Sequence, residues 1–193
     1  MDKFLESSEY IDWQHTAILE KAASLSGVSS TPLETARACF EWVRDNIRHT
    51  GDYQDNTITC RASDVLLMGT GYCYAKSHLL AALLRANRIP AGLCYQRLSR
   101  DENGPPFCLH GLTAVSLQAF GWYRIDPRGN KTGVNAEFCP PAEKLAFLIQ
   151  FSGEADLPEI WSEPLPVIIE ALQNYQSHQG VWENLPDIPL INS

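Results

Sequence analysis

The sequence predicts an α+β fold in which helices precede a sheet and one further helix follows it. Apolar residues recur at helical spacing as far as Arg88, and after Pro90 the pattern changes to short apolar or alternating segments. No internal repeat or low-complexity segment interrupts this order. At 193 residues the chain is long enough to bury a substantial core, so we expect one domain spanning residues 1–193.

Two helices are expected in the N-terminal part of the chain. Residues 11–25 carry apolar side chains at a spacing typical of an amphipathic helix. The second helix begins at Thr31-Pro32-Leu33-Glu34, which is a capping box with proline at the first helical position. One apolar stripe follows, and the helix should end near His49, before Gly51.

A polar loop is expected over residues 50–62 and a short helical turn over residues 63–67. Gly69-Thr70-Gly71 then predicts a sharp turn, because glycine permits backbone conformations that other residues avoid. The turn leads into Cys73 and a leucine-rich segment that continues to Arg88. This segment predicts a strong helix that begins at the cysteine.

The C-terminal half is expected to form the sheet. Three strands are predicted: Ala91–Leu98, Leu109–Leu117 and Trp122–Asp126. Residues 127–144 show no regular pattern, and Pro166–His178 predicts a last amphipathic helix. The tail after Gly180 is expected to lie on the surface.

Charge and hydropathy exclude several classes of partner. The net charge of -8 disfavours binding to nucleic acid, whose phosphates would be repelled, and no run of basic residues offsets it. No apolar run approaches the ~20 residues that cross a membrane. The N-terminus has no secretory pattern, so we expect a cytoplasmic protein that acts on a peptide, a protein or a small amide.

One of the six cysteines stands out by its position. Without a secretory signal the cysteines are expected to be free thiols, and most of them buried and inert. Cys73 differs because it opens a helix directly after a glycine turn. The helix dipole and the free N–H groups there stabilise a thiolate, which is the nucleophilic form. A packed structural thiol is the alternative for Cys73.

A nucleophilic cysteine needs a base, and His110 is the best candidate. It lies in a predicted strand between Leu109 and Leu112. His78 lies about 140° around the helix from Cys73, so it should be a solvated or capping residue. The remaining histidines are expected at the surface or at a helix end: His15, His49 and His178.

Asp126 is the candidate for the acid that orients His110. The two residues are separated by 126 − 110 = 16 positions, which is even. If their strands form a hairpin centred near Gln118, the two side chains lie opposite each other on one face. A satisfied core histidine and a turn carboxylate are the alternatives for these two residues.

The segments around these residues resemble the transglutaminase-like superfamily. GTGYCYAKSHLLAALLRANRIPAG is similar to the family's nucleophile segment, and GWYRIDPRGN to its aspartate segment. ETARACFEWVRDNIRHT resembles the helix that precedes these segments, and SDVLLMGTG resembles the lead into the cysteine. The resemblance covers residues 33–130 and leaves residues 145–193 as a C-terminal extension. It implies a papain-like core, in which the nucleophile helix packs on an antiparallel sheet.

The resemblance implies that Cys73 is the nucleophile, His110 the base and Asp126 the orienting acid. Two positions depart from the family. His110-Gly111-Leu112 lacks the aromatic residue of the usual H-A-W, and Arg128 stands where many members have a small polar residue. Both departures concern the class of substrate rather than the triad.

The expected reaction is acyl transfer through a thioester at Cys73, with hydrolysis favoured over transfer to an amine. The backbone N–H of Cys73 is the expected oxyanion donor. Aromatic side chains near the site could line the substrate cleft, namely those of Tyr72, Tyr74 and Trp122. A binding or scaffold module that retains this fold without catalysis is the alternative function.

A zinc site is a competing interpretation of some of the same residues. Cys108 and His110, with Cys94 or Cys139, could supply ligands, but their spacing matches no standard zinc pattern. No loop resembles a calcium site. We therefore expect neither a metal nor a cofactor.

Overall fold

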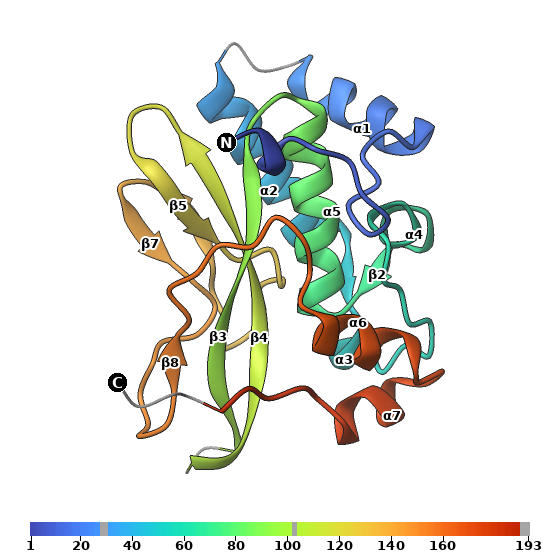
Figure 1. Cartoon of the computed structure of the whole chain (residues 1–193), viewed down its shortest axis with the longest axis vertical. Helices are drawn as coiled ribbons and strands as arrows, with labels where there is room; N and C mark the ends of the chain where they lie inside the picture. Colours follow the sequence, from blue (N-terminus) through green and yellow to red (C-terminus); the bar gives the residue numbers. More distant parts are fainter. Residues whose placement is uncertain (28–30, 102–103, 190–193) are drawn as a thin grey trace.

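The structure is a computed structural model that describes residues 1–27, 31–101 and 104–189. Figure 1 shows helices on one side of a twisted sheet, with the last helices near one end of it. The helices are η1 (Asp2–Phe4), α1 (Thr16–Ser26), α2 (Pro32–Asn46), α3 (Thr50–Tyr53), α4 (Ala62–Met68), α5 (Cys73–Ala86), α6 (Pro166–Gln173) and α7 (His178–Glu183). The strands are β1 (Arg48–His49), β2 (Thr70–Gly71), β3 (Ala91–Asp101), β4 (Gly104–Leu117), β5 (Gly121–Ile125), β6 (Glu137–Cys139), β7 (Ala142–Lys144) and β8 (Ala155–Asp156).

Helix α5 lies at the centre of the molecule. It packs against α1, α2 and α4 on one side and against β3 and β4 on the other (Figure 1). Its residues are buried from Cys73 to Arg85, as expected for a helix with neighbours all round. Even Arg85 is buried, and its guanidinium donates hydrogen bonds to the carbonyl oxygens of Ala91, Glu6 and Ser162.

The main sheet is antiparallel, with the strand order β5-β4-β3-β8. Strands β3 and β4 form a long hairpin that extends the predicted strands to Asp101 and back to Gly104. The three predicted strands are therefore present. The α+β prediction and the packing of the nucleophile helix on an antiparallel sheet are confirmed.

Several predicted boundaries were wrong for local reasons. Helix α1 starts at Thr16 rather than near residue 11, and the His15 ring accepts a hydrogen bond from the N–H of Ala17. Helix α2 ends at Asn46, because the chain must become extended for β1 to pair with β2 in parallel. The segment 127–144, predicted to be irregular, contains the small hairpin β6–β7.

The C-terminal part adds two helices and a return along the sheet. Helix α6 ends at Gln173, before the predicted end at His178, and α7 starts at His178 after a side-chain cap from Ser177. Beyond α7 the chain runs beside β4, where the N–H of Leu109 donates a 2.7 Å hydrogen bond to the carbonyl of Pro186. No helix among the described residues is long and apolar enough to cross a membrane.

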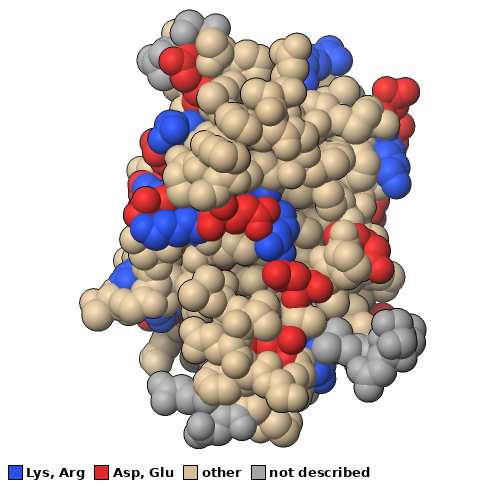
Figure 2. All heavy atoms as spheres, turned by 90° about the vertical axis from the view of Figure 1, so that its left-hand side faces the viewer, with Lys and Arg blue, Asp and Glu red and all other residues tan. Residues whose placement is uncertain are grey.

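Opposite charges alternate over the face formed by β5, β7 and β8. Figure 2 shows basic and acidic side chains next to one another in a band across this face. Arg124 pairs with both Glu143 and Asp156 there, at 2.6 and 2.5 Å. The acidic side chains on this face are therefore partly neutralised by neighbouring basic side chains.

Candidate active site

Cys73 is the first residue of α5, directly after the extended Tyr72 and the short strand β2. Gly71 lies in a crowded position, since a side chain there would meet Thr59 at 3.1 Å and Ala75 at 3.2 Å. Of the predicted glycine turn, only Gly69 has a left-handed backbone (φ 67°), and it ends α4, whereas Thr70 and Gly71 form β2. The Cys73 thiol is only 7% exposed and accepts a hydrogen bond from the N–H of Gly111 at 3.4 Å.

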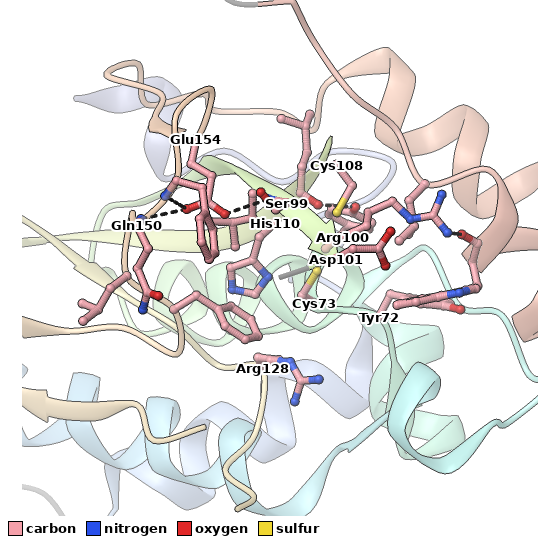
Figure 3. A pocket seen from close by; sticks show the side chains of 18 of the residues that line it. Tyr72, Cys73, Ser99, Arg100, Asp101, Cys108, His110, Arg128, Gln150 and Glu154 are labelled. Carbon is pink, nitrogen blue, oxygen red and sulfur yellow. Dashed lines mark hydrogen bonds between the residues drawn. The ribbon is translucent and has the colours of Figure 1, made fainter. Parts of the chain in front are cut away.

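His110 and Asp126 lie together at the start of this helix. Nε2 of His110 is 2.8 Å from Oδ2 of Asp126, and both side chains are buried. The imidazole also lies beside the Cys73 sulfur (Figure 3), and its interaction with that sulfur helps to raise the pKa of His110. The structure thus brings together the three residues that the sequence singled out.

Asp126 is held by two further hydrogen bonds. Its carboxylate accepts from the backbone N–H of Arg128 and of Ala146, each at 3.0 Å. Burial alone would raise the pKa of Asp126, but His110 and these two donors hold it below its usual range. The carboxylate therefore stays charged and has little freedom to turn.

The environment of His110 favours its protonated form. Burial opposes the charged ring, but the nearby Asp126 carboxylate and Cys73 sulfur outweigh it and raise the pKa of His110 to about 10. A protonated imidazole beside a thiolate is the ion pair that cysteine-dependent acyl transfer requires.

The hairpin register differs from the prediction. The last pair of strands β4 and β5 is Thr113 with Ile125, so the hairpin is centred one residue beyond Gln118. Asp126 therefore lies level with Leu112 and diagonal to His110, rather than directly opposite it. The two side chains still share a face, because the offset from direct pairing is two residues.

The helix start lies very close to the sheet at Gly111. A side-chain carbon there would lie 2.9 Å from the Tyr74 ring and 3.0 Å from the Tyr74 Cα. The phenol of Tyr74 donates a hydrogen bond to the carbonyl of Leu109 at 2.5 Å. These contacts hold the first turn of α5 against β4, with His110 beside it.

An aromatic residue from a distant segment covers the imidazole. Phe147 packs edge-on against His110, with ring centroids 5.0 Å apart. Leu112, at the position where the family usually has an aromatic residue, is instead buried on the sheet with Cys94 and Ala114. The sequence around His110 contains no signal for this contact, because Phe147 lies 37 residues later (147 − 110).

Cys73 and His110 open onto a cavity of about 340 Å³, whereas Asp126 is fully buried and does not line it. Figure 3 shows its lining, which comes from the N-terminus of α5, the hairpin β3–β4, the segment around Phe147 and α7. Tyr72 and Tyr74 line it, as the sequence suggested. The Tyr72 phenol donates to the carbonyl of His178 at 2.9 Å, and burial raises its pKa to about 12.

The expectation that Trp122 lines the cleft is wrong. Trp122 pairs with Ser116 near the far end of the hairpin, and its ring packs edge-on against Phe4 at 4.8 Å. It shares a strand with the segment that leads to Asp126, but that strand carries it away from the cavity.

Arg128 links this site to the segment after β1. Its guanidinium makes a bidentate ion pair with Asp52, at 2.7 and 2.8 Å. The central carbon of the guanidinium, Cζ, lies 5.5 Å from the centre of the Phe147 ring. Lys131 also contacts Asp52, at 2.6 Å. The sequence showed Arg128 as a departure from the family but gave no sign of its partner.

His49 and Lys76 are two buried groups that the sequence analysis missed. His49 lines the cavity, because it lies in β1 between the end of α2 and the start of α3, and its ring packs against Tyr72. Burial, together with Arg128, lowers the pKa of His49 well below its usual value. Lys76, one turn after Cys73, donates to the carbonyls of Ile47 and Arg44, and burial lowers its pKa to about 7.

His78 was expected to be solvated or capping, and that expectation is wrong. The side chain is buried between α5 and α4, and Nδ1 lies 2.8 Å from the carbonyl of Cys60. Burial lowers its pKa to about 4. As predicted from the helical angle, it does not face Cys73.

The six cysteines are free thiols, and the residues of the zinc interpretation are dispersed. Cys108 lines the cavity, Cys94 is buried with Leu112, and Cys139 lies on β6. Within the described part of the chain, no three His, Cys, Asp or Glu side chains gather as metal ligands. The geometry therefore offers no support for the zinc alternative.

Sequence comparison assigns the family. The model of the transglutaminase-like superfamily core matches residues 20–127, which contain α5, the long hairpin and Asp126. The chain belongs to the transglutaminase-like superfamily. The match begins within α1, earlier than the resemblance over residues 33–130, and no curated protein matches the chain.

Solved structures resemble this transglutaminase-like domain at low sequence identity. A presumed cysteine protease from Cytophaga hutchinsonii is 21% identical with a TM-score of 0.53, over 65% of this chain and 40% of that one. The periplasmic domain of TgpA from Pseudomonas aeruginosa is 18% identical with a TM-score of 0.49, over 64% of this chain and 45% of that one. This chain therefore matches less than half the length of these proteins. The first likeness supports the transglutaminase-like fold.

Proposed function

We propose that this domain is a cysteine-dependent enzyme that cleaves an amide or peptide-like bond through a thioester. The observation that carries the proposal is the arrangement of Cys73 at a helix start, beside a buried His110 whose Nε2 lies 2.8 Å from Asp126. Each residue has a common structural role on its own. Together they form the nucleophile, base and orienting acid of a triad.

In the proposed first step, the Cys73 sulfur attacks the amide carbonyl carbon and the carbonyl electrons move onto oxygen. The backbone N–H of Cys73 at the positive end of α5 stabilises that oxyanion. The imidazolium of His110 then gives its proton to the amide nitrogen, the C–N bond breaks, and an amine leaves. Asp126 keeps the ring oriented and remains ionised throughout.

In the second step, His110 takes a proton from water, which attacks the thioester carbonyl. Collapse of that intermediate releases a carboxylic acid and restores the Cys73 thiolate with a protonated His110. We propose hydrolysis rather than transfer to a second amine, because water is always available and no separate amine site is assigned. The proposed substrate is a peptide, a protein or a small amide.

A screen of thiol-directed activity probes and amide substrates tests the proposal. Wild-type protein should turn over at least one amide, and Cys73→Ser should reduce that turnover by more than about 1000-fold while the melting temperature changes little. Cys139→Ser is the matched control, since Cys139 lies on β6 away from the cavity, and it should keep full activity. Equal activity of Cys73→Ser and wild type would refute the triad. If no substrate is cleaved and no probe prefers Cys73, the scaffold function is favoured instead.

A further inference from the structure

The charged side chains that line the cavity differ in whether other groups of the protein already bind their charge. Arg128 is paired with Asp52, and the carboxylate of Glu154 accepts hydrogen bonds from three backbone N–H groups, those of Ser99, Gln150 and Phe151, at 2.8, 2.8 and 3.0 Å. Arg100 and Asp101, at the end of β3, also line the cavity (Figure 3). Neither of them forms an ion pair with a described residue.

Arg100 has hydrogen-bonding capacity that the described residues leave unused. Nη2 donates to the carbonyl of Trp182 at 2.7 Å, and the guanidinium lies 5.2 Å from the centre of the Trp182 ring. Its Nε is buried and has no partner in the described part of the chain. Because this nitrogen is closed to solvent, an acceptor from outside would bind the rest of the guanidinium of this half-buried side chain, which lines the cavity.

Most other arginines of the described residues have a carboxylate partner, which Arg100 lacks. Arg97, three residues earlier on the same strand, makes a bidentate pair with Asp187 at 2.6 Å for both contacts. Arg124 and Arg128 are each paired with carboxylates as well. Among the arginines of the described ranges, only Arg88 and Arg100 have no carboxylate partner, and Arg88 lies at the end of α5, away from the cavity.

The walls beside Arg100 are apolar. Phe147, Phe151 and Trp182 line the cavity, and the last two are 38% and 47% exposed. An apolar group that binds against them would bury their rings and gain hydrophobic stabilisation. The cavity thus combines an apolar wall with one cationic fork whose geometry matches a carboxylate.

We propose that Arg100 recognises a carboxylate of the substrate, so that this domain acts on amides that carry both an acid group and an apolar group. This inference rests on the proposed function and names its substrate class. Asp101 lies at the exposed rim, and its charge weakens the attraction, so Asp101→Asn should strengthen binding of an acidic substrate. Arg100 is proposed as a specificity-determining residue that contacts substrate and takes no part in proton transfer.

Thiol-reactive probes test this inference without a known substrate. N-iodoacetyl-phenylalanine and its C-terminal amide share the reactive group and the apolar ring, and differ only in carboxylate against carboxamide. Alkylation of Cys73, in which the sulfur displaces iodide, is followed by mass spectrometry over a range of probe concentrations. The quantity compared is the ratio of the second-order rate constants for acid and amide.

The wild-type ratio should favour the acid by about 10-fold or more, as expected for a hydrogen-bonded charge pair. Arg100→Gln should bring the ratio close to 1, Arg100→Lys should restore part of it, and Arg88→Gln should keep the wild-type ratio. A ratio that is unchanged in Arg100→Gln would overturn the inference. So would an equal slowing of both probes together with a lower melting temperature, because Arg100 would then only hold α7 in place through Trp182.

The same experiment separates the two proposals. If Cys73 is alkylated no faster than the other thiols, the proposed catalytic function fails. If Cys73 is alkylated preferentially but with no dependence on Arg100, only the carboxylate inference fails.

Discussion

The carboxylate of Asp126 lies 2.8 Å from Nε2 of His110 although the two residues are diagonal neighbours across the hairpin β4–β5. A diagonal position suffices because both side chains project from the same face and an imidazole bridges the extra distance. The backbone N–H groups of Arg128 and Ala146 complete the contacts of the carboxylate. The pair is therefore part of a fixed network rather than a single contact.

Replacing Asp126 with asparagine should impair the reaction and preserve the fold. The amide keeps an oxygen for the N–H of Arg128 but removes the charge that raises the pKa of His110. We expect turnover of any substrate found by the screen to fall at least about 100-fold. The free energy of unfolding should fall by about 1–3 kcal/mol. Kinetics and chemical denaturation measure these two effects. NMR titration should show a lower pKa for His110 in the variant. If the variant keeps wild-type turnover, Asp126 does not orient the base.

Cys73 should be the most reactive thiol toward iodoacetamide at neutral pH. Burial raises the pKa of Cys39, Cys60 and Cys108 to about 12, and it also raises that of Cys94. Mass spectrometry of a time course should show Cys73 modified at least about 10-fold faster than these four. His110→Ala should slow the reaction. Faster modification of Cys139 or Cys60 would mean that exposure alone governs reactivity.

Gly111 should tolerate no side chain, because the first turn of α5 lies against it. Gly111→Ala places a carbon 2.9 Å from the Tyr74 ring, so the helix start must move. We expect a loss of about 1–3 kcal/mol in the free energy of unfolding and slower alkylation of Cys73. Ser116→Ala, further along the same strand and opposite Trp122, is the control and should change neither quantity appreciably. Unchanged stability of Gly111→Ala would contradict the close packing.

The ion pair of Arg128 with Asp52 should stabilise the fold at neutral pH and lose its effect in acid. Burial would raise the pKa of Asp52, but hydrogen bonds from Arg128 and Lys131 lower it to about 2, against a value of 3.8 in the unfolded chain. A carboxylate with a lowered pKa stabilises the fold above pH 3.8, and that contribution is lost as the pH falls towards 2. After allowance for its solvent-exposed part, the contribution is about 1 kcal/mol.

Asp52→Asn should therefore lower stability at pH 7 and flatten its decline between pH 3.8 and 2. Urea denaturation at a series of pH values gives both quantities. Asp187→Asn removes the partner of Arg97 outside the cavity, and it should leave Cys73 alkylation unchanged. If the free energy of unfolding falls equally steeply below pH 3.8 in Asp52→Asn and in wild type, other carboxylates are responsible for that fall.

Local sequence patterns predicted the parts of the site that depend on periodicity. The capping box at Thr31 starts α2 as predicted, and its hydroxyl accepts from the N–H of Glu34 at 3.2 Å. Cys73 is the first residue of α5 as predicted, and the even spacing places His110 and Asp126 on one face. Such features follow from the helical and strand periods, which act over a few residues.

The sequence by itself thus determined the order of the longer helices and of the three central strands, the start of the helix at Cys73 and the three residues that meet there. Only the tertiary structure decided the hairpin register, the contact of Phe147 with His110, the pairing of Arg128 with Asp52 and the placement of Trp122 against Phe4. The physical reason is that these contacts join side chains far apart along the chain. Their formation depends on the paths of the intervening loops and on competition for space in the core, which local periodicity does not encode.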